Sequence, residues 1–137
     1  MSYLLDTNVV SELARARPEP RVLSWFAGVA DEALYLSVLT LGELRNGVES
    51  LPRGARRERL RNWLERDLPG WFDNRLLHVD AAIVDRWGRL AASAGRTLPA
   101  IDSLLAATAL QHDLRVVTRN ASDFDLPGVE VVDPWAK

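Results

Sequence analysis

The sequence predicts an α/β fold built around a mostly parallel sheet. Short apolar runs, each long enough for one strand, alternate along the 137 residues with longer segments of helical periodicity. The central runs lack alternating polar residues, as expected for strands that helices cover on both faces. Because no repeat or linker interrupts the alternation, we expect a single domain over residues 1–137.

The strands and helices follow from the periodicity and its breaks. Strands are expected at residues 2–5, 33–38, 75–79, 115–118 and 129–132. Helices are expected at residues 8–15, 20–29, 41–50, 54–68 and 100–113, and from Asp80 to Ala94. Asp80 is expected to cap its helix, and Pro69 is expected to end the helix over 54–68.

The composition excludes several kinds of chemistry. With no cysteine, the chain forms neither disulfides nor thiolate zinc sites. Its only lysine is Lys137, beside 16 arginines, which argues against P-loop nucleotide binding, Schiff-base chemistry and a phosphorylated receiver domain. The net charge of −2 gives no overall sign of a nucleic-acid partner. No membrane span or secretory signal is visible, so we expect a cytoplasmic protein.

Polar residues stand where three of the predicted strands end, and ligands of open α/β sheets bind beyond the carboxyl ends of strands. These residues are Asp6, Thr7 and Asn8 after the first strand, Glu43 in the helix after the second, and Thr118, Asn120 and Asp123 after the fourth. A further acid, Asp102, stands near the start of an otherwise apolar helix, and the pattern alone does not settle which edge it faces.

Each acid also has an ordinary structural explanation. Asp6 could cap a helix, Thr40 to Glu43 form a formal capping box, Asp102 suits a helix dipole, and Asp123 suits a loop turn. Taken together these explanations weaken, because several carboxylates gathered at one edge repel one another unless a cation binds them. Oxygen ligands alone favour Mg²⁺ or Mn²⁺.

The two histidines do not add to this cluster. His78 lies in an apolar strand and is expected to be packed or surface-facing. His112 lies in the last turn of a helix, where a cation suits the dipole. We therefore expect neither histidine to take part in catalysis.

The chain resembles the PIN-domain nucleases, and within them the VapC and FitB type of bacterial toxin. The resemblance rests on four segments in the family's order and approximate spacing: LLDTNVVSE (4–12), LSVLTLGELRNGV (36–48), LPAIDSLLAATAL (98–110) and RVVTRNASDF (115–124). It implies a three-layer α/β/α sandwich with a five-stranded parallel sheet. It further implies cleavage of RNA with Mg²⁺ or Mn²⁺, homodimerisation and inhibition by a small antitoxin.

Carried over motif by motif, the resemblance assigns the site residues. Asp6, Glu43 and Asp102 match three family acids, which places Asp102 at the active edge. The fourth acidic position falls either on Asn120, an amide where some relatives carry Asp, or on Asp123. The resemblance makes Asp6 and Asp102 the principal metal ligands and gives Glu43 either a second ion or the attacking water. Thr7 and Asn8 would fix the Asp6 carboxylate or touch the scissile phosphate, and Thr118 and Asn120 would support the site.

Several alternatives stay open at this point. The Asn120 substitution would suit a catalytically weak PIN-like module that only binds nucleic acid, and the substrate could be DNA. The stretch 53–66 has six arginines against two glutamates; a solvated face with Glu–Arg pairs is favoured over an RNA guide. Trp25, Phe26 and Trp63 could belong to the core or line a groove for a partner.

Overall fold

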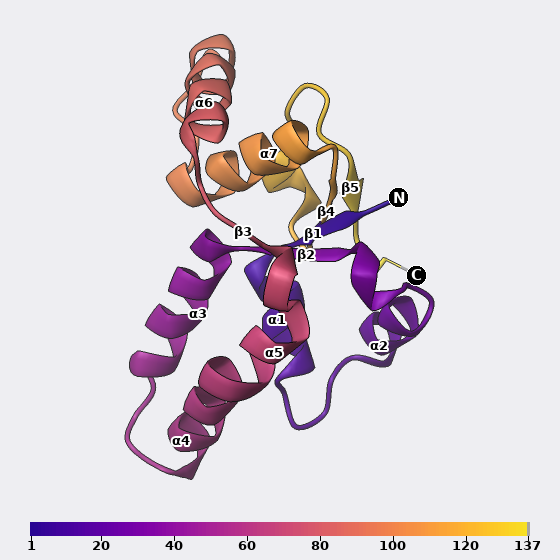
Figure 1. The fold of residues 1–137 in the computed structure, drawn as a ribbon, viewed down its shortest axis with the longest axis vertical. Helices are drawn as coiled ribbons and strands as arrows, with labels where there is room; N and C mark the ends of the chain where they lie inside the picture. Colours follow the sequence, from indigo (N-terminus) through magenta and orange to yellow (C-terminus); the bar gives the residue numbers. More distant parts are fainter. Residues whose placement is uncertain (137) are drawn as a thin grey trace.

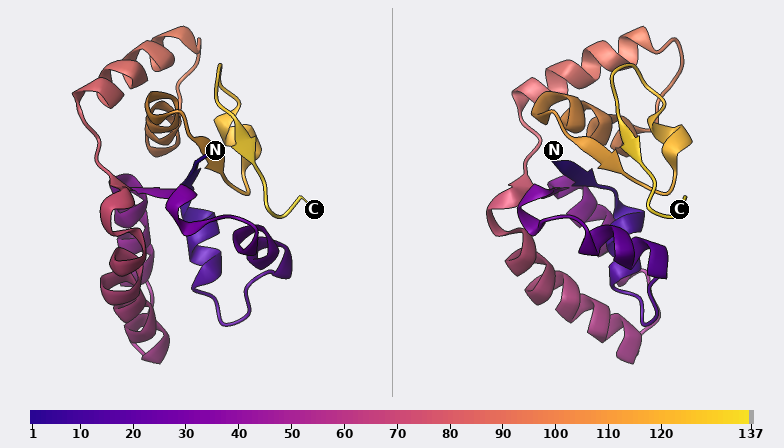
Figure 2. Two further views of the ribbon diagram at one scale, coloured as in Figure 1. Left: turned by 45° about the vertical axis from the view of Figure 1, so that its right-hand side comes forward. Right: turned by 90° about the vertical axis from the view of Figure 1, so that its right-hand side faces the viewer.

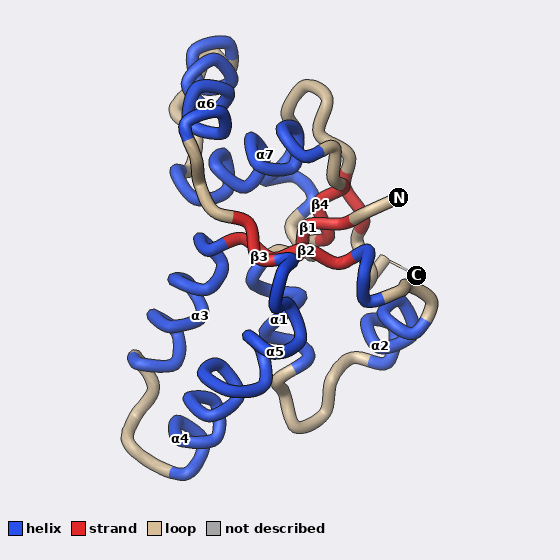
Figure 3. The backbone as a smooth tube through the Cα atoms, viewed as in Figure 1, coloured by secondary structure: helices blue, strands red, loops and turns tan. Residues whose placement is uncertain are grey.

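Five parallel strands form the centre of the molecule (Figure 3). In the computed structural model, which describes residues 1–136, they are β1 (Tyr3–Leu5), β2 (Leu34–Ser37), β3 (Leu76–Leu77), β4 (Arg115–Val117) and β5 (Val131–Val132). Their order is β3-β2-β1-β4-β5, and every neighbouring pair runs parallel. The sheet expected to be mostly parallel is therefore entirely parallel. Lys137, the only lysine, lies outside the described residues.

Helices cover both faces of this sheet. They are α1 (Thr7–Leu13), α2 (Pro20–Ala27), α3 (Val38–Glu49), α4 (Ala55–Asn62), α5 (Leu68–Phe72), α6 (Ala81–Ser93) and α7 (Ala100–His112). Figures 1 and 2 show α6 and α7 on one side of the strands and α1 to α5 on the other. The expected α/β/α sandwich is thus confirmed. Among residues 1–136, no helix has both the length and the apolar character needed to cross a bilayer.

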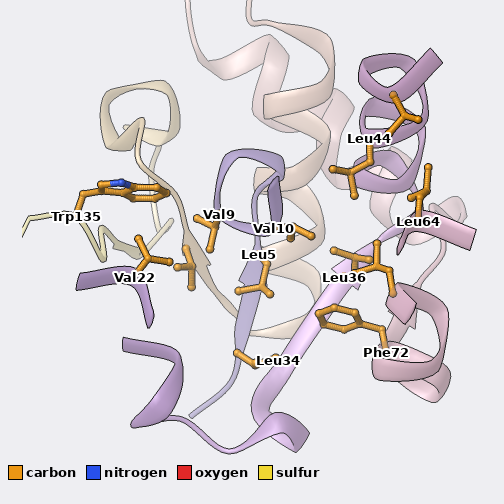
Figure 4. Packing of buried hydrophobic residues seen from close by; sticks show 13 residues of the cluster. Leu5, Val9, Val10, Val22, Leu34, Leu36, Leu44, Leu64, Phe72 and Trp135 are labelled. Carbon is orange, nitrogen blue, oxygen red and sulfur yellow. The ribbon is translucent and has the colours of Figure 1, made fainter. Parts of the chain in front are cut away.

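Each face of the sheet has its own hydrophobic core, because neighbouring residues of a strand point to opposite faces. Leu4 and Val116 pack with residues of α7, whereas Leu5 and Val117 pack with α1, α2 and α3. The second core includes Trp135, and Figure 4 shows Trp135 above Val22 of α2, to the side of Val9 and Val10 of α1. The end of the chain is therefore tied to the same core as its beginning.

The helix expected over residues 54–68 does not end at Pro69. α4 continues through a wide π-helical turn, Trp63–Asp67, into α5, which contains Pro69 in its first turn. The backbone N–H of Leu68 bonds to the carbonyl of Trp63, five residues back. Pro69 therefore stands where the hydrogen-bond pattern of the helix changes, directly after a π-helical turn, rather than where the helix ends.

The capping box expected from Thr40 to Glu43 is also wrong. α3 begins earlier, at Val38, and its cap is Ser37, whose hydroxyl oxygen accepts the N–H of Leu39 at 3.1 Å. Thr40 is fully buried, and among the described residues its hydroxyl has no hydrogen-bond partner. Since Glu43 lies in the second turn rather than at the cap, its carboxylate is free to serve the site.

We expect the substitution Thr40→Val to raise the free energy of unfolding by about 1 kcal/mol, because it removes a buried hydroxyl that has no partner. Thr108→Val is the matched control, since the Thr108 hydroxyl is also buried in a helix but donates to the carbonyl of Leu104 at 2.8 Å. Urea unfolding of both variants is the measurement. A loss of stability in Thr40→Val larger than that in Thr108→Val would contradict the expectation.

Candidate active site

The pairing of β1 with β4 places the first acid. Leu5 lies opposite Val117 in the ladder, and the N–H of Asp6 donates to the carbonyl of Val117 at 2.9 Å. The residues that follow, Asp6 and Thr118, therefore leave the sheet side by side. The Thr118 hydroxyl donates to Oδ2 of Asp6 at 2.8 Å, although 112 positions separate the two residues in the sequence.

Several donors hold the Asp6 carboxylate in one orientation. Oδ1 accepts the backbone N–H of Thr7 at 2.8 Å, and Oδ2 accepts the amide of Asn8 at 3.2 Å as well as the Thr118 hydroxyl. Asp6 is only 6% exposed. Burial raises the pKa of Asp6 above its ordinary value, although these three hydrogen bonds act in the opposite direction. The bonds fix the carboxylate without fully offsetting its removal from water.

Glu43 is attached to this group through Thr7. The Thr7 hydroxyl, in the first turn of α1, donates to Oε1 of Glu43 in the second turn of α3. Both residues line the same cleft. One hydrogen bond thus fixes the second acid relative to the first, across two helices that both begin at the carboxyl edge of the sheet.

Asp102 lies at the same edge, which settles a point that its sequence pattern left open. It occupies the first turn of α7, and this turn is tied to α6 by the indole N–H of Trp87, which donates to the Ser103 hydroxyl at 2.9 Å. Burial, followed by the negative charges of Asp6, Asp123 and Glu43, raises the pKa of Asp102 to about 6. The four predicted acids therefore share one electrostatic field.

The fourth acidic position still has two candidates. Asp123 lies exposed in the short 3₁₀ helix Ala121–Phe124, and its charge contributes to the raised pKa of both Asp6 and Asp102. Asn120 is also exposed; its backbone N–H donates to the Thr118 hydroxyl oxygen at 3.0 Å. Asp123 thus supplies negative charge to the site, whereas Asn120 is linked to Asp6 through the Thr118 hydroxyl.

A cleft of about 890 Å³ leads from the acids toward the α3–α4 hairpin. Thr7, Asn8 and Glu43 line its acidic end. Its walls carry five arginines from α4, the α1–α2 connection and the loop after β4, namely Arg15, Arg17, Arg56, Arg59 and Arg119. The cleft therefore joins a negative end to positive walls. His78 and His112 are exposed and do not line it.

The basic stretch 53–66 divides between two roles. Glu49 accepts hydrogen bonds from Arg45, Arg57 and Arg61, and these arginines lower the pKa of Glu49 to about 2, Arg61 having the largest effect. That part is the solvated, paired face that the sequence favoured. Arg56 and Arg59 instead line the cleft.

The aromatic residues divide in a similar way. Trp25 packs edge-on against Tyr3, with ring centroids 5.1 Å apart, and both Trp25 and Phe26 pack against the core beneath α1 and α2. Trp63 also packs against this core but lines the cleft as well. Trp25 and Phe26 therefore belong to the core, whereas Trp63 belongs both to the core and to the wall of the cleft.

The donor set fits a hard divalent cation. The carboxylates of Asp6, Glu43, Asp102 and Asp123, with the amide of Asn120, supply oxygen alone, and their mutual repulsion would be relieved by a cation. Within residues 1–136, however, no three carboxylates or histidines converge as a ready-made metal cage.

Sequence reasoning missed the residues that support the site from a distance. Arg119 stands in the loop after β4, and its guanidinium lies 5.2 Å from the ring centroid of Trp135. Both residues line the cleft. The only available signals were the position of Arg119 within TRN and the terminal DPW, and neither shows that the two residues meet.

The raised pKa of Asp102 predicts a pH dependence of stability in metal-free protein. Because the folded-state pKa, about 6, exceeds the ordinary value of 3.8, Asp102 favours folding below about pH 4. This contribution is lost as the pH rises through 6. Thermal unfolding in EDTA should show that Asp102→Asn gains stability relative to wild type between pH 4 and 7. A difference that is flat with pH would contradict the shift.

Comparison with known proteins places the chain in a family. The PIN domain family model matches residues 3–127. The chain is 40% identical over 135 residues to the toxin FitB of Neisseria gonorrhoeae, covering 96% of this chain and 97% of FitB. It is 38% identical over 135 residues to the VapC ribonuclease Y4jK of Sinorhizobium fredii, covering 96% of each chain. The crystal structure of FitAcB from Neisseria gonorrhoeae superposes with a TM-score of 0.90 and 37% identity, over 98% of this chain and 99% of that one. This chain therefore belongs to the PIN domain family.

Proposed function

We propose that this protein is an endoribonuclease toxin that hydrolyses RNA phosphodiesters and is neutralised by a cognate antitoxin. The observation that carries the proposal is the gathering of four acids at one sheet edge, where three of them act on the pKa of the fourth, Asp102. The relatives, named a VapC ribonuclease and a toxin, supply the substrate class and the biological role. We also propose a cytoplasmic location and homodimerisation, which this role suits.

Mg²⁺ is the proposed cofactor, with Mn²⁺ as a substitute. Asp6 and Asp102 would hold the ion, and Glu43 would hold a second ion or orient the attacking water. When bound, such an ion lowers the pKa of coordinated water and neutralises charge on the phosphate. The metal requirement is supported by the all-oxygen donor set and by the repulsion among its carboxylates.

The protein's own residues supply orientation. Thr118, Asn8 and the Thr7 backbone fix the plane of the Asp6 carboxylate, so that it need not reorganise during the reaction. The Thr7 hydroxyl donates to Oε1 of Glu43. The other carboxylate oxygen, Oε2, is not used in this bond and can accept a proton from water. These contacts suit in-line attack of water on a phosphodiester.

A weaker nuclease that mainly binds nucleic acid is the alternative, and the amide at Asn120 is the observation that favours it. An amide supplies an oxygen ligand without charge, so a second ion would bind less tightly at that position. DNA as the substrate is a further outcome that the experiment below distinguishes.

We expect Asp6→Asn and Asp102→Asn each to reduce RNA cleavage by at least about 100-fold, because each removes charge from the site while keeping the size of the side chain. The measurement is cleavage of labelled tRNAs, rRNA fragments and single-stranded DNA with Mg²⁺, Mn²⁺ or EDTA. Both variants should also bind Mn²⁺ more weakly in a titration.

The matched control is Asp31→Asn, an exposed acid before β2 and therefore at the opposite edge of the sheet. It should cleave like wild type. Full activity in Asp6→Asn or Asp102→Asn would contradict the assignment, as would full wild-type activity in EDTA. Cleavage confined to the DNA substrate would replace RNA with DNA in the proposal.

Single substitutions should separate Asn120 from Asp123. If Asp123 is the fourth acid, Asp123→Ala lowers activity about tenfold or more and Asn120→Ala lowers it less. If Asn120 holds that position, Asn120→Asp retains or raises the affinity for Mn²⁺, measured by calorimetry. The electrostatic contribution of Asp123 to Asp6 and Asp102 favours the first result. Small and equal effects of all three substitutions would mean that three acids suffice.

The antitoxin is expected to compete with the metal. An Arg or Lys of such a partner could enter the carboxylate cluster and replace the cation through charge-assisted hydrogen bonds. Co-purified with the small protein encoded beside it, the toxin should be inhibited, and inhibition should weaken as Mg²⁺ or Mn²⁺ is raised. Inhibition insensitive to metal would point to blocked access of RNA, and a neighbour that does not bind would contradict the toxin role.

A further inference from the structure

Arg119 is the cleft arginine most directly attached to the acidic site. Its backbone N–H donates to Oδ1 of Asn8 at 3.1 Å, and Asn8 in turn donates to the Asp6 carboxylate at 3.2 Å. Arg119 also directly follows Thr118, the other donor to Asp6. A single loop thus attaches the backbone of Arg119 to the acidic site, and Arg119 lines the same cleft as Glu43.

The side chain of Arg119 is exposed yet held by an aromatic ring. Its guanidinium carbon lies 5.2 Å from the ring centroid of Trp135, a cation–π contact. Among residues 1–136, the guanidinium makes no hydrogen bond or ion pair, although, beside the larger effect of the Arg21 hydrogen bond, its charge helps to lower the pKa of Glu19. Because no hydrogen bond to these residues occupies the N–H groups of the guanidinium, they remain available to an anion.

Trp135 is itself fixed from two sides. It is 7% exposed, and its backbone N–H donates to the Asp133 carboxylate at 2.8 Å. Its backbone carbonyl accepts a hydrogen bond from the Arg21 side chain on α2. Glu19 pairs with Arg21 at 2.8 Å and completes the support. This rigid base reduces the conformational entropy that Arg119 would lose on binding a ligand.

We infer that Arg119 binds a phosphate of the RNA strand beside the reacting one, and that Trp135 is the residue that positions Arg119 for this contact. The inference rests on the proposed function, which supplies RNA as the ligand. The physical need is clear, because clustered carboxylates repel a polyanion and an adjacent cation offsets that repulsion. Arg17, Arg56 and Arg59 continue the positive wall of the cleft, whereas Arg15 there pairs with Glu12 at 3.3 Å.

The test measures binding without catalysis. Metal-free protein in EDTA is titrated with a fluorescently labelled single-stranded RNA at several salt concentrations. For Arg119→Gln, we expect Kd to rise about 5- to 20-fold. The plot of log association constant against log salt should become shallower by about 0.7, the value for one lost phosphate contact on a single strand. Arg119→Lys should retain the slope, because it keeps the charge, but only part of the affinity.

Arg115→Gln is the matched control, because it removes the same charge from the other end of β4 and breaks only an exposed pair with Glu130. Its Kd and slope should equal those of wild type. Trp135→Leu should weaken RNA binding less than Arg119→Gln does. The double variant should bind RNA no more weakly than Arg119→Gln alone. Trp135→Phe, which keeps an aromatic ring, should bind RNA like wild type. Circular dichroism checks that each variant is folded.

An unchanged Kd and slope in Arg119→Gln would overturn the inference, as would equal losses in Arg115→Gln. Additive effects of Trp135→Leu and Arg119→Gln would overturn the positioning role. Loss of antitoxin binding with intact RNA binding would assign Arg119 to the partner instead. If the expected binding result appears but wild type cleaves nothing with any metal, the phosphate contact stands and the nuclease proposal fails.

Discussion

The parallel pairing of β1 with β4 is the constraint on which the site depends. It sets Leu5 opposite Val117, so that the chain leaves the sheet at Asp6 and Thr118 side by side. Both strands are buried, and a shift of register by one residue would turn their apolar side chains to the wrong faces. The packing of the two cores therefore also fixes the geometry of the buried carboxylate.

The cluster of acids is held together against its own repulsion. The pKa of Asp6 and that of Asp102 are both raised, because burial and the charges of neighbouring acids disfavour the charged carboxylates. Hydrogen bonds from Thr7, Asn8 and Thr118 offset part of this cost and orient the carboxylates. Such a destabilised arrangement is typical of a site that binds a cation, and the stability of the rest of the fold allows it to persist.

Arginine serves different purposes on different sides of the cleft. Glu49 of α3 pairs with Arg57 and Arg61 of α4, and with Arg45 of its own helix. Each such pair adds little to stability, but the two that join α3 to α4 together restrict the orientation of the hairpin. The hairpin in turn carries Arg56 and Arg59 on the wall of the cleft. At the other end, the guanidinium of Arg119 lies over the ring of Trp135 in a cation–π contact. A chain with a net charge of −2 thus concentrates positive charge along one groove.

The sequence by itself determined the five strands, the α/β architecture and the acids at the strand ends, because apolar periodicity and strand-terminal polar residues depend on local order in the chain. The predicted helix end at Pro69 and the predicted capping box at Thr40 were wrong. At both places the neighbouring turns, rather than a single residue, decide how a helix continues or begins. Only the tertiary structure decided that Asp102 shares the field of Asp6 and Glu43, and that Trp135 supports Arg119. These contacts join residues far apart in the chain, and they exist only once both cores have packed and the sheet has brought its carboxyl ends to one edge.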